Sequence, residues 1–128
     1  MSYKLKKDFN HSSIVYIKFN GKKIGNFSGV ELPSKEYSLM LKAHCASFYY
    51  VQLFNNYEGK GHFINAMSLL TQSLSDKFDK LIVRCPLKKD EWTGLASKLK
   101  ELGNISSFSF EKKNESFLIL NLINEKVI

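Results

Sequence analysis

Apolar positions along the chain repeat with two periods, and these periods predict where strands and helices lie. Residues 14–19, 47–54 and 80–85 are rich in β-branched and aromatic side chains, which is typical of strands. Elsewhere apolar residues recur every three or four positions, so they share one face of a helix. Two such faces occur: Phe63, Ala66, Met67, Leu70 and Leu74, then Trp92, Leu95, Ala96, Leu99 and Leu102.

The segments between these elements carry turn signals. Asn20-Gly21 is a strong hairpin signal because both residues accept positive φ angles, and residues 22–32 return as a partner strand that is bulged at its glycines. Residues 32–37 predict a turn, whereas residues 38–46 fit either a strand extension or a short helix. Gly103-Asn104 is a typical end for the second helix.

The two ends of the chain complete the pattern. Residues 105–110 and 116–123 predict a final hairpin, and the polar residues 1–12 form either a loose segment or a sheet edge. The strand–helix–strand order in the middle implies a right-handed crossover with parallel pairing, whereas the outer hairpins are antiparallel. We therefore expect one α/β (α+β) domain over residues 1–128, with a mixed, mostly antiparallel twisted sheet and flanking helices.

Composition narrows the functional classes. The chain has 128 residues, 44% of them hydrophobic, and a net charge of +7, which suits one domain with a substantial core. No apolar run reaches the roughly 18 residues of a membrane span, so we expect a cytoplasmic protein without membrane contact. Cys45 and Cys85 lack the spacing of a metal site, and none is expected. Only Arg84 among the 19 basic residues is an arginine, which favours a lysine-covered surface over sequence-specific DNA binding but leaves nucleic acid open as a partner.

A glycine-rich turn, Glu58-Gly59-Lys60-Gly61, stands between strand 47–54 and the first helix. The first N–H groups of a helix lack intrahelical partners, and the helix dipole adds positive charge there, so such a turn can bind a phosphate. Two interpretations remain: the glycines only form the turn, or they bring the backbone close to an anion. His62, in the first helical turn, is either a phosphate donor or a solvated surface histidine.

The order of these elements and their motifs resembles the GNAT superfamily of acyl-CoA-dependent N-acyltransferases. FYYVQLFNNYEGKGHF is similar to the family's fourth strand and pyrophosphate loop, whose Gln/Arg-x-x-Gly-x-Gly/Ala motif matches residues 56–61. IVYIKFNGKKIGNFSG looks like the family's second and third strands, and LASKLKELGN is similar to its fourth helix. The resemblance covers residues 14–123 and implies a small or divergent member with a fold truncated at the N-terminus.

The resemblance implies acetyl-CoA (coenzyme A) as the cofactor and transfer of an acyl group to an amine of a protein or small molecule by direct attack. It places the pyrophosphate on the backbone of residues 58–63, the pantetheine arm on strand 47–54, and the acyl carbonyl between this strand and strand 80–85. The implied cofactor-binding residues are Leu53, Asn56, Glu58, Gly59, Lys60, Gly61, His62 and Phe63.

The catalytic residues are not evident from the sequence. The family often has a tyrosine, as general acid, where this chain has Leu99, and a glutamate on its fourth strand, where SFYYVQLF has no carboxylate. His44 and Cys45 do not suggest a catalytic pair, since neighbours on a strand point to opposite faces. An alternative function is a catalytically silent GNAT-like fold that binds a protein or nucleic acid through a basic surface. The amine acceptor stays open, and so does assembly into a homodimer or with another protein.

Overall fold

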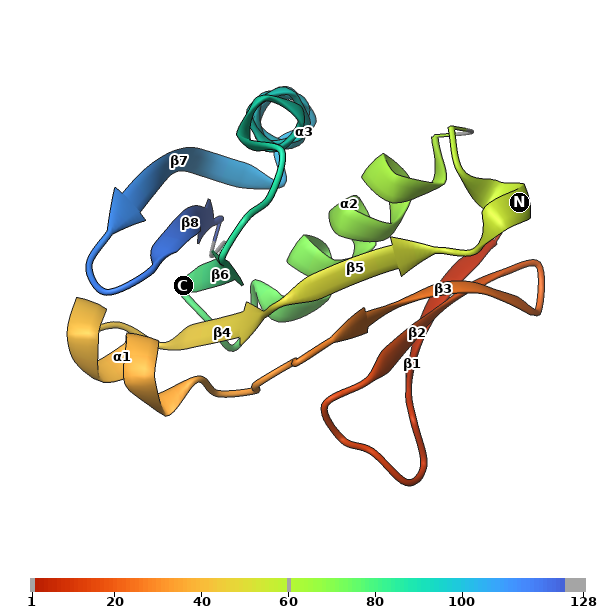
Figure 1. Ribbon diagram of the computed structural model, residues 1–128, viewed down its shortest axis with the longest axis horizontal. Helices are drawn as coiled ribbons and strands as arrows, with labels where there is room; N and C mark the ends of the chain where they lie inside the picture. Colours follow the sequence, from red (N-terminus) through yellow and green to blue (C-terminus); the bar gives the residue numbers. More distant parts are fainter. Residues whose placement is uncertain (1, 60, 124–128) are drawn as a thin grey trace.

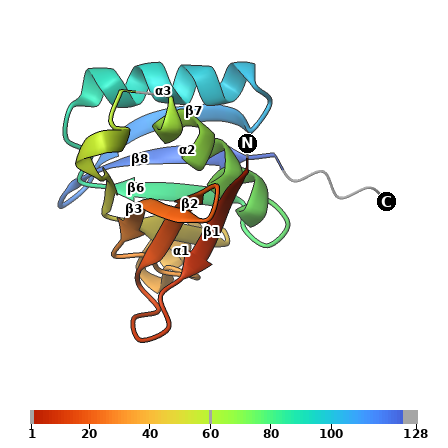
Figure 2. The same cartoon turned by 90° about the vertical axis from the view of Figure 1, so that its right-hand side faces the viewer.

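The structure, a computed structural model, describes residues 2–59 and 61–123. Its elements, drawn in Figure 1 and from the side in Figure 2, are β1 (Tyr3–Lys7), β2 (Val15–Phe19), β3 (Lys22–Ser28), α1 (Lys35–Leu41), β4 (Cys45–Phe48), β5 (Tyr50–Leu53), the 3-10 turn η1 (Asn55–Tyr57), α2 (His62–Leu74), β6 (Lys80–Arg84), α3 (Lys89–Glu101), β7 (Ile105–Lys112) and β8 (Ser116–Leu122). The first 12 residues were expected to be either a loose segment or a sheet edge, and β1, within them, is an edge strand. No helix within the described ranges is long and apolar enough to cross a membrane.

The strands form two four-stranded sheets. The N-terminal sheet has the order β1-β2-β3-β5, and the C-terminal sheet has the order β4-β6-β8-β7. β4 and β6 pair in parallel, as expected of strands joined through a crossover helix, and the other neighbouring strands are antiparallel. This confirms the predicted mixed, mostly antiparallel fold with flanking helices, although its strands are divided between two sheets.

The predicted turns have different outcomes. Asn20 and Gly21 have φ angles of 51° and 85°, so the β2–β3 hairpin closes with the expected positive-φ turn. Residues 32–37 are more than a turn, because α1 begins at Lys35 after Ser34, whose hydroxyl accepts a hydrogen bond from the N–H of Tyr37. The ambiguous segment 38–46 is therefore helix where it begins and strand β4 where it ends.

The stretch 47–54, expected as one strand, is divided at Tyr49. Phe48 of β4 points into the main core, and so do Val51 and Leu53 of β5. Side chains on one face of a strand are an even number of residues apart, so the step from Phe48 to Val51 contains one extra residue, as a β-bulge does. β4 consequently stays with β6, while β5 pairs with β3.

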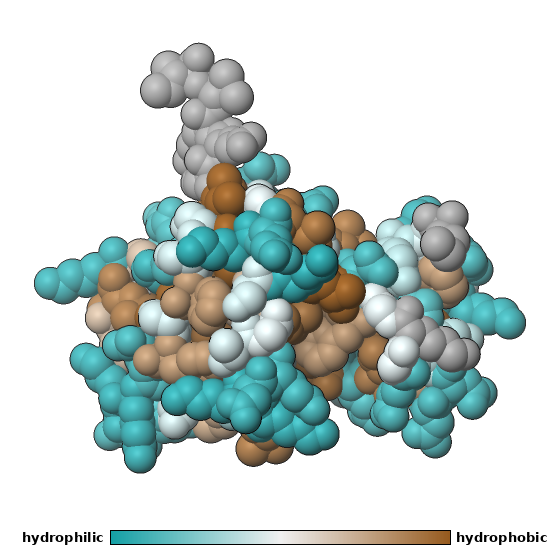
Figure 3. Space-filling model, turned by 90° about the horizontal axis from the view of Figure 1, so that it is seen from above, coloured by the Kyte–Doolittle hydropathy of each residue, from teal (hydrophilic) through white to brown (hydrophobic). Residues whose placement is uncertain are grey.

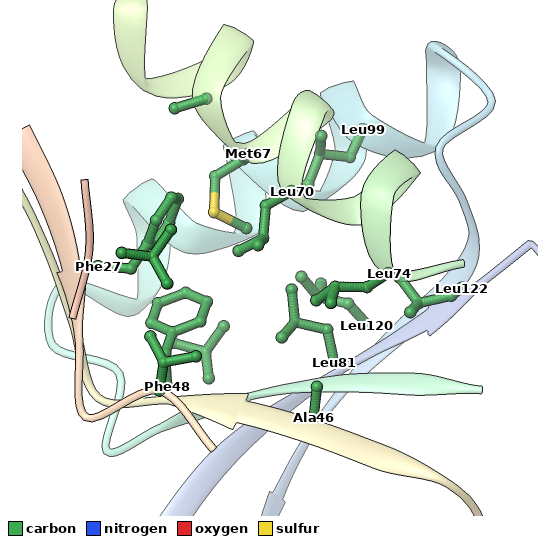
Figure 4. Close-up of a cluster of buried hydrophobic side chains, with 14 of the residues drawn as sticks. Phe27, Ala46, Phe48, Met67, Leu70, Leu74, Leu81, Leu99, Leu120 and Leu122 are labelled. Atoms are coloured by element: carbon green, nitrogen blue, oxygen red, sulfur yellow. The ribbon is translucent and has the colours of Figure 1, made fainter. Parts of the chain in front are cut away.

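The main core fills the space between the strands and helices α2 and α3 (Figure 4). Met67, Leu70 and Leu74 of α2 are buried there, and Leu99 of α3 is fully buried beside them. These positions confirm the predicted helix faces, except that Leu102 lies just past the end of α3 and is 53% exposed. Seen from the side of α2 and α3, the molecular surface mixes apolar and hydrophilic side chains (Figure 3).

A smaller core lies under α1, on the other face of the C-terminal sheet. It consists of Tyr37, Cys45, Ile82, Phe117 and Ile119. The central strand β6 is therefore covered on both faces, which is why its three middle residues, Leu81, Ile82 and Val83, are all apolar and buried.

Candidate functional site

Strands β5 and β6 diverge next to Phe48. β4 pairs in parallel with β6 as far as Phe48, opposite Val83, and the next residue, Tyr49, donates its N–H to the carbonyl of Ser28 instead. β5 continues along β3, so it is an edge strand whose other side has backbone groups without a strand partner. The divergence lies between segments 47–54 and 80–85, where the acyl carbonyl is expected (Figure 1).

The glycine turn follows β5 directly in the chain. Gly59 and Gly61 have φ angles of 73° and 76°, and a Cβ on either would meet no atom within 4 Å. Glycine is therefore favoured here by backbone conformation and not by crowding. Gly61 is the N-cap of α2 and provides no side-chain cap, so the first N–H groups of the helix remain directed at the turn. Lys60, between the two glycines, lies outside the described residues.

The other predicted cofactor residues differ in their exposure. Asn56 and Glu58 are exposed in the turn, and Leu53 is half-buried at the end of β5. Phe63 is half-buried in the first turn of α2 and packs edge-on against Trp92, with ring centroids 5.4 Å apart. The turn thus presents polar groups to solvent, and its two ends are anchored by apolar contacts.

His62 is buried, so the interpretation of it as a solvated surface histidine is wrong. It is 7% exposed, and its Nδ1 lies 2.6 Å from the hydroxyl of Tyr3. The rings of Phe19 and Tyr57 lie 4.7 and 5.7 Å from the imidazole. These contacts tie the first turn of α2 to β1 and β2, and they leave only a small part of the ring open to a ligand.

A polar cluster lies at the end of β6, on the face of the sheet that α1 covers. The Arg84 guanidinium reaches three carboxylates: Nη1 lies 3.1 Å from Glu31, and Nη2 lies 3.5 Å from Glu36 and 3.0 Å from Glu115. The same guanidinium lies 4.3 Å from the centroid of the Tyr49 ring. Because Tyr49 is the residue at which β4 and β5 separate, this cluster lies beside the divergence of the strands.

Glu115, in the turn before β8, collects hydrogen bonds from three sides. Cys85 Sγ donates to its Oε2 at 3.2 Å, and the Tyr37 hydroxyl and Arg84 donate to its Oε1 at 3.0 Å. The hydrogen bonds from Cys85, Arg84 and Tyr37 hold the pKa of Glu115 below its ordinary value of 4.5. The hydrogen bond to Glu115, with burial, raises the pKa of the Cys85 thiol. Near neutral pH the pair is therefore a carboxylate and a thiol.

A cavity of about 210 Å³ opens at this cluster. Its apolar lining comes from Tyr37, Met40 and Phe117, and its charged lining consists of Glu36, Arg84, Lys113 and Glu115. Two carboxylates and two cations balance in charge, and together with the apolar wall they suit a group that combines a hydrocarbon part with a polar end.

Sequence reasoning missed this cluster. Glu115 lies in segment 111–115, between the two strands of the predicted final hairpin, and was not among the candidate site residues. One signal was present: Arg84 is the single arginine and directly follows three buried apolar residues, and such a charge needs acidic partners. Glu31 and Glu115 lie 53 and 31 residues away from Arg84, so the sequence could not identify them as those partners.

Three further residues, His44, Cys45 and Leu99, lie outside the candidate site. Cys45 is buried in the smaller core, and the adjacent His44 is exposed, so they do not form a pair. Leu99, at the position where the GNAT family often has a tyrosine, is directed into the main core (Figure 4).

Comparison with known proteins bears on the fold. A GNAT-family acetyltransferase from Listeria monocytogenes 4b F2365 has a similar structure, with a TM-score of 0.61 over 88% of this chain and 10% sequence identity. The chain spans 65% of the length of that protein. No protein-family model and no curated protein matches the sequence. The chain therefore has a GNAT-like fold, and at this identity the likeness extends to the fold alone.

Proposed function

We propose that the protein is a GNAT-like acyltransferase that binds acetyl-CoA and transfers its acyl group to an amine. The observation that carries the proposal is the divergence of β5 from β6, with the uncapped N-terminus of α2 following β5 in the chain. The free edge of β5 suits an extended ligand arm, and the helix N-terminus suits a pyrophosphate. The GNAT-like fold supports the same arrangement.

The cofactor side is formed by the glycine turn and its flanks. The backbone of residues 58–63 surrounds the pyrophosphate, and the positive charge of Lys60 offsets the negative charge of Glu58. Asn56 donates an amide hydrogen bond from the turn, and Leu53 contacts the pantetheine arm. Acetyl-CoA supplies an activated thioester, so the protein has to position the acyl carbon and donate hydrogen bonds to its oxygen from the free edge of β5.

The acceptor side is the cavity beside Glu115. The apolar wall formed by Tyr37, Met40 and Phe117 accepts the hydrocarbon part of an amine, and the carboxylate of Glu115 accepts a hydrogen bond from its nitrogen. The amine attacks as the neutral base, after it has lost one proton to water. Glu115 is ionised at neutral pH and takes the second proton as the C–N bond forms, while the C–S bond breaks and the thiolate of coenzyme A leaves and is protonated by water. Arg84 is a positioning residue, since it holds the carboxylate of Glu115 next to Tyr49 and the divergence of the strands.

Isothermal titration with acetyl-CoA tests the cofactor side. Gly61→Glu places a negative side chain at the N-terminus of α2, and we expect it to abolish the heat of binding seen for the unchanged protein. Gly103→Glu is the matched control, because Gly103 also has a positive φ, 79°, and open space around its Cβ, but lies after α3. Equal binding by the unchanged protein and by Gly61→Glu, or no heat at high micromolar ligand, refutes the cofactor assignment.

Thiol release with a panel of primary amines tests the acceptor side. Glu115→Gln keeps the shape of the side chain but removes its capacity to take a proton, so we expect turnover to fall by about 10²–10⁴-fold. Binding of acetyl-CoA should be retained in this variant. A turnover equal to that of the unchanged protein refutes the role of Glu115.

One observation favours a second candidate function, a GNAT-like module that binds but does not catalyse. Leu99 has no exposed surface and packs among core residues, so its position offers no proton to a leaving thiolate. Binding of acetyl-CoA without thiol release for any amine tested would favour this second function over the first.

A further inference from the structure

The outer face of the N-terminal sheet carries a group of lysines. Leu5, Ile17 and Phe27 point from β1, β2 and β3 into the main core, so their neighbours Lys4, Lys6, Tyr16, Lys18 and Asn26 point away from it. A register shift between Ile17 and Lys18 places Lys23 of β3 opposite Lys18, on the same outer face. We call this surface the lysine face; it consists of Lys4, Lys6, Tyr16, Lys18, Lys23, Asn26, Tyr50 and Gln52. Figure 1 shows α2 on the opposite side of the sheet.

Three of these lysines form a row across neighbouring strands. Lys4 of β1 is in register with Lys18 of β2, which is in register with Lys23 of β3. Strands lie about 4.8 Å apart, and like charges directly opposite one another are destabilising. Lys6 adds a fourth charge two residues from Lys4 on the same face. A row of this kind concentrates positive potential on a flat surface.

These charges have no acidic partners nearby. Within the described ranges, no carboxylate lies within 4.0 Å of any of the four ammonium groups. Asp8, at the end of β1, is engaged by the hydroxyl of Tyr16, which lowers its pKa. Lys23 is instead held over the ring of Tyr16, 4.0 Å from the centroid. The face is therefore complementary in charge to an external anion with several charges.

The residues beside the lysines indicate which polyanion fits. Asn26 and Gln52 face each other in register, and both carry amides that can donate and accept hydrogen bonds. Tyr50, two residues before Gln52 on the same face, is 64% exposed. Amides and an exposed aromatic ring next to positive charges are the groups that hydrogen-bond and stack on unpaired bases.

A membrane surface fits this face less well. Large apolar residues with high exposure, Phe9, Leu39, Leu87 and Leu102, belong to loops, to α1 and to the end of α3, outside the strands of the lysine face. Attachment of a basic surface to a bilayer usually combines charge with apolar side chains that enter it. The four strands offer charge, amides and a phenol ring.

We propose that the lysine face binds single-stranded nucleic acid, with the four lysines on its phosphates and Tyr50 stacked under a base. Lysine contacts phosphate as a point charge, whereas bidentate recognition of guanine favours arginine, so the binding is tolerant of sequence. The inference does not depend on acyl transfer: the lysine face and the proposed acyl-CoA site both include β5, but no side chain of the lysine face lines the cavity beside Glu115 or belongs to the glycine turn.

Fluorescence anisotropy with short labelled oligonucleotides, one of DNA and one of RNA, tests the proposal on the full chain. Four phosphate contacts give a slope of about −2.8 in log K against log salt, so affinity should fall about 50-fold between about 50 and 200 mM salt. Lys4→Gln with Lys18→Gln should halve the slope, leaving a decrease of about sevenfold. Tyr50→Ser should weaken binding about fivefold or more and leave the slope unchanged. The comparison of DNA with RNA shows which of the two oligonucleotides binds more tightly, and binding of either one supports the proposal.

Lys77→Gln with Lys112→Gln is the matched control. Both lysines are exposed and lie off the lysine face, and the change in net charge is the same. Binding by this control should equal that of the unchanged protein. Equal losses in the two double variants overturn the proposal in favour of diffuse attraction by net charge. Attachment to anionic lipid vesicles without binding of either oligonucleotide overturns it in favour of a membrane surface.

Discussion

Replacing Gly25 by alanine tests how closely β3 and β5 must pack beside the candidate site. A Cβ at Gly25 would lie 2.1 Å from the carbonyl oxygen of Gln52 in β5. Cβ atoms essentially never lie closer than 3.0 Å to such an atom, so the two backbones must separate by about 0.9 Å, the difference between 3.0 and 2.1 Å. The pairing of Gly25 with Leu53 cannot survive this movement undisturbed.

The expected cost follows from two contributions. Overpacking costs about 1–3 kcal/mol, and weakening two strand hydrogen bonds adds about 1–2 kcal/mol, giving about 2–5 kcal/mol in total. Gly94→Ala is the matched control, because Gly94 lies on the exposed side of α3 and its Cβ would meet nothing within 4 Å. There the same substitution should stabilise the protein by about 1 kcal/mol, through helix propensity.

Thermal unfolding measures both effects. With an unfolding entropy of about 2.1 cal/mol/K per residue, the 128 residues give about 0.27 kcal/mol/K. Gly25→Ala should therefore lower the Tm by about 7–18 °C, and Gly94→Ala should raise it by about 4 °C. An unchanged Tm for Gly25→Ala, or a shift of both variants in the same direction, would contradict the close packing of β3 on β5.

Three further predictions concern the cluster and the core. The pKa of Glu115 in the folded protein lies below 4.5, so the stabilising effect of its carboxylate is complete above pH 4.5 and is lost as the pH falls through the lower folded pKa. Urea unfolding should therefore show Glu115→Gln less stable than the unchanged protein at neutral pH and equally stable in acid, and a difference that does not change with pH contradicts this. Arg84→Gln should lower the free energy of unfolding by about 1–2 kcal/mol in the same assay, because the carboxylate partners of Arg84 are partly exposed. As a control, Lys98→Gln breaks an exposed ion pair and should lower the free energy of unfolding by less than about 0.5 kcal/mol. Leu99→Tyr should lower the free energy of unfolding by about 2–5 kcal/mol, through overpacking and an unpaired hydroxyl, without a gain in thiol release. Leu102→Tyr, at an exposed position, should leave the free energy of unfolding almost unchanged. A stable Leu99→Tyr variant with faster thiol release contradicts the burial argument.

The sequence predicts those parts of the fold that depend on local patterns. The faces of α2 and α3 follow from apolar spacing, and the β2–β3 hairpin follows from Asn20-Gly21. The division of segment 47–54 was not predicted, although its signal is local: core-facing Phe48 and Val51 are an odd number of residues apart. An aromatic and β-branched segment was sufficient to predict a strand but did not show that the strand changes sheets.

Of the candidate site, only the glycine turn is predictable from the sequence. The glycine turn is one contiguous segment, so its left-handed residues and helix N-terminus can be inferred from sequence. The cluster around Arg84 combines side chains from the segment before α1, from α1 itself, from β6 and from the β7–β8 turn. Which glutamates meet the arginine is decided by the packing of those elements, and no spacing in the chain encodes it.

The extra residue between Phe48 and Val51 has a consequence for how such a site can arise. Without Tyr49, these two side chains would be an even distance apart, and one strand could place both in the core without leaving its sheet. The separation of β5 from β6 is therefore tied to the number of residues in this segment. A change of one codon in length would move Val51 and the rest of β5 to the other face relative to Phe48, which no substitution of a single side chain does.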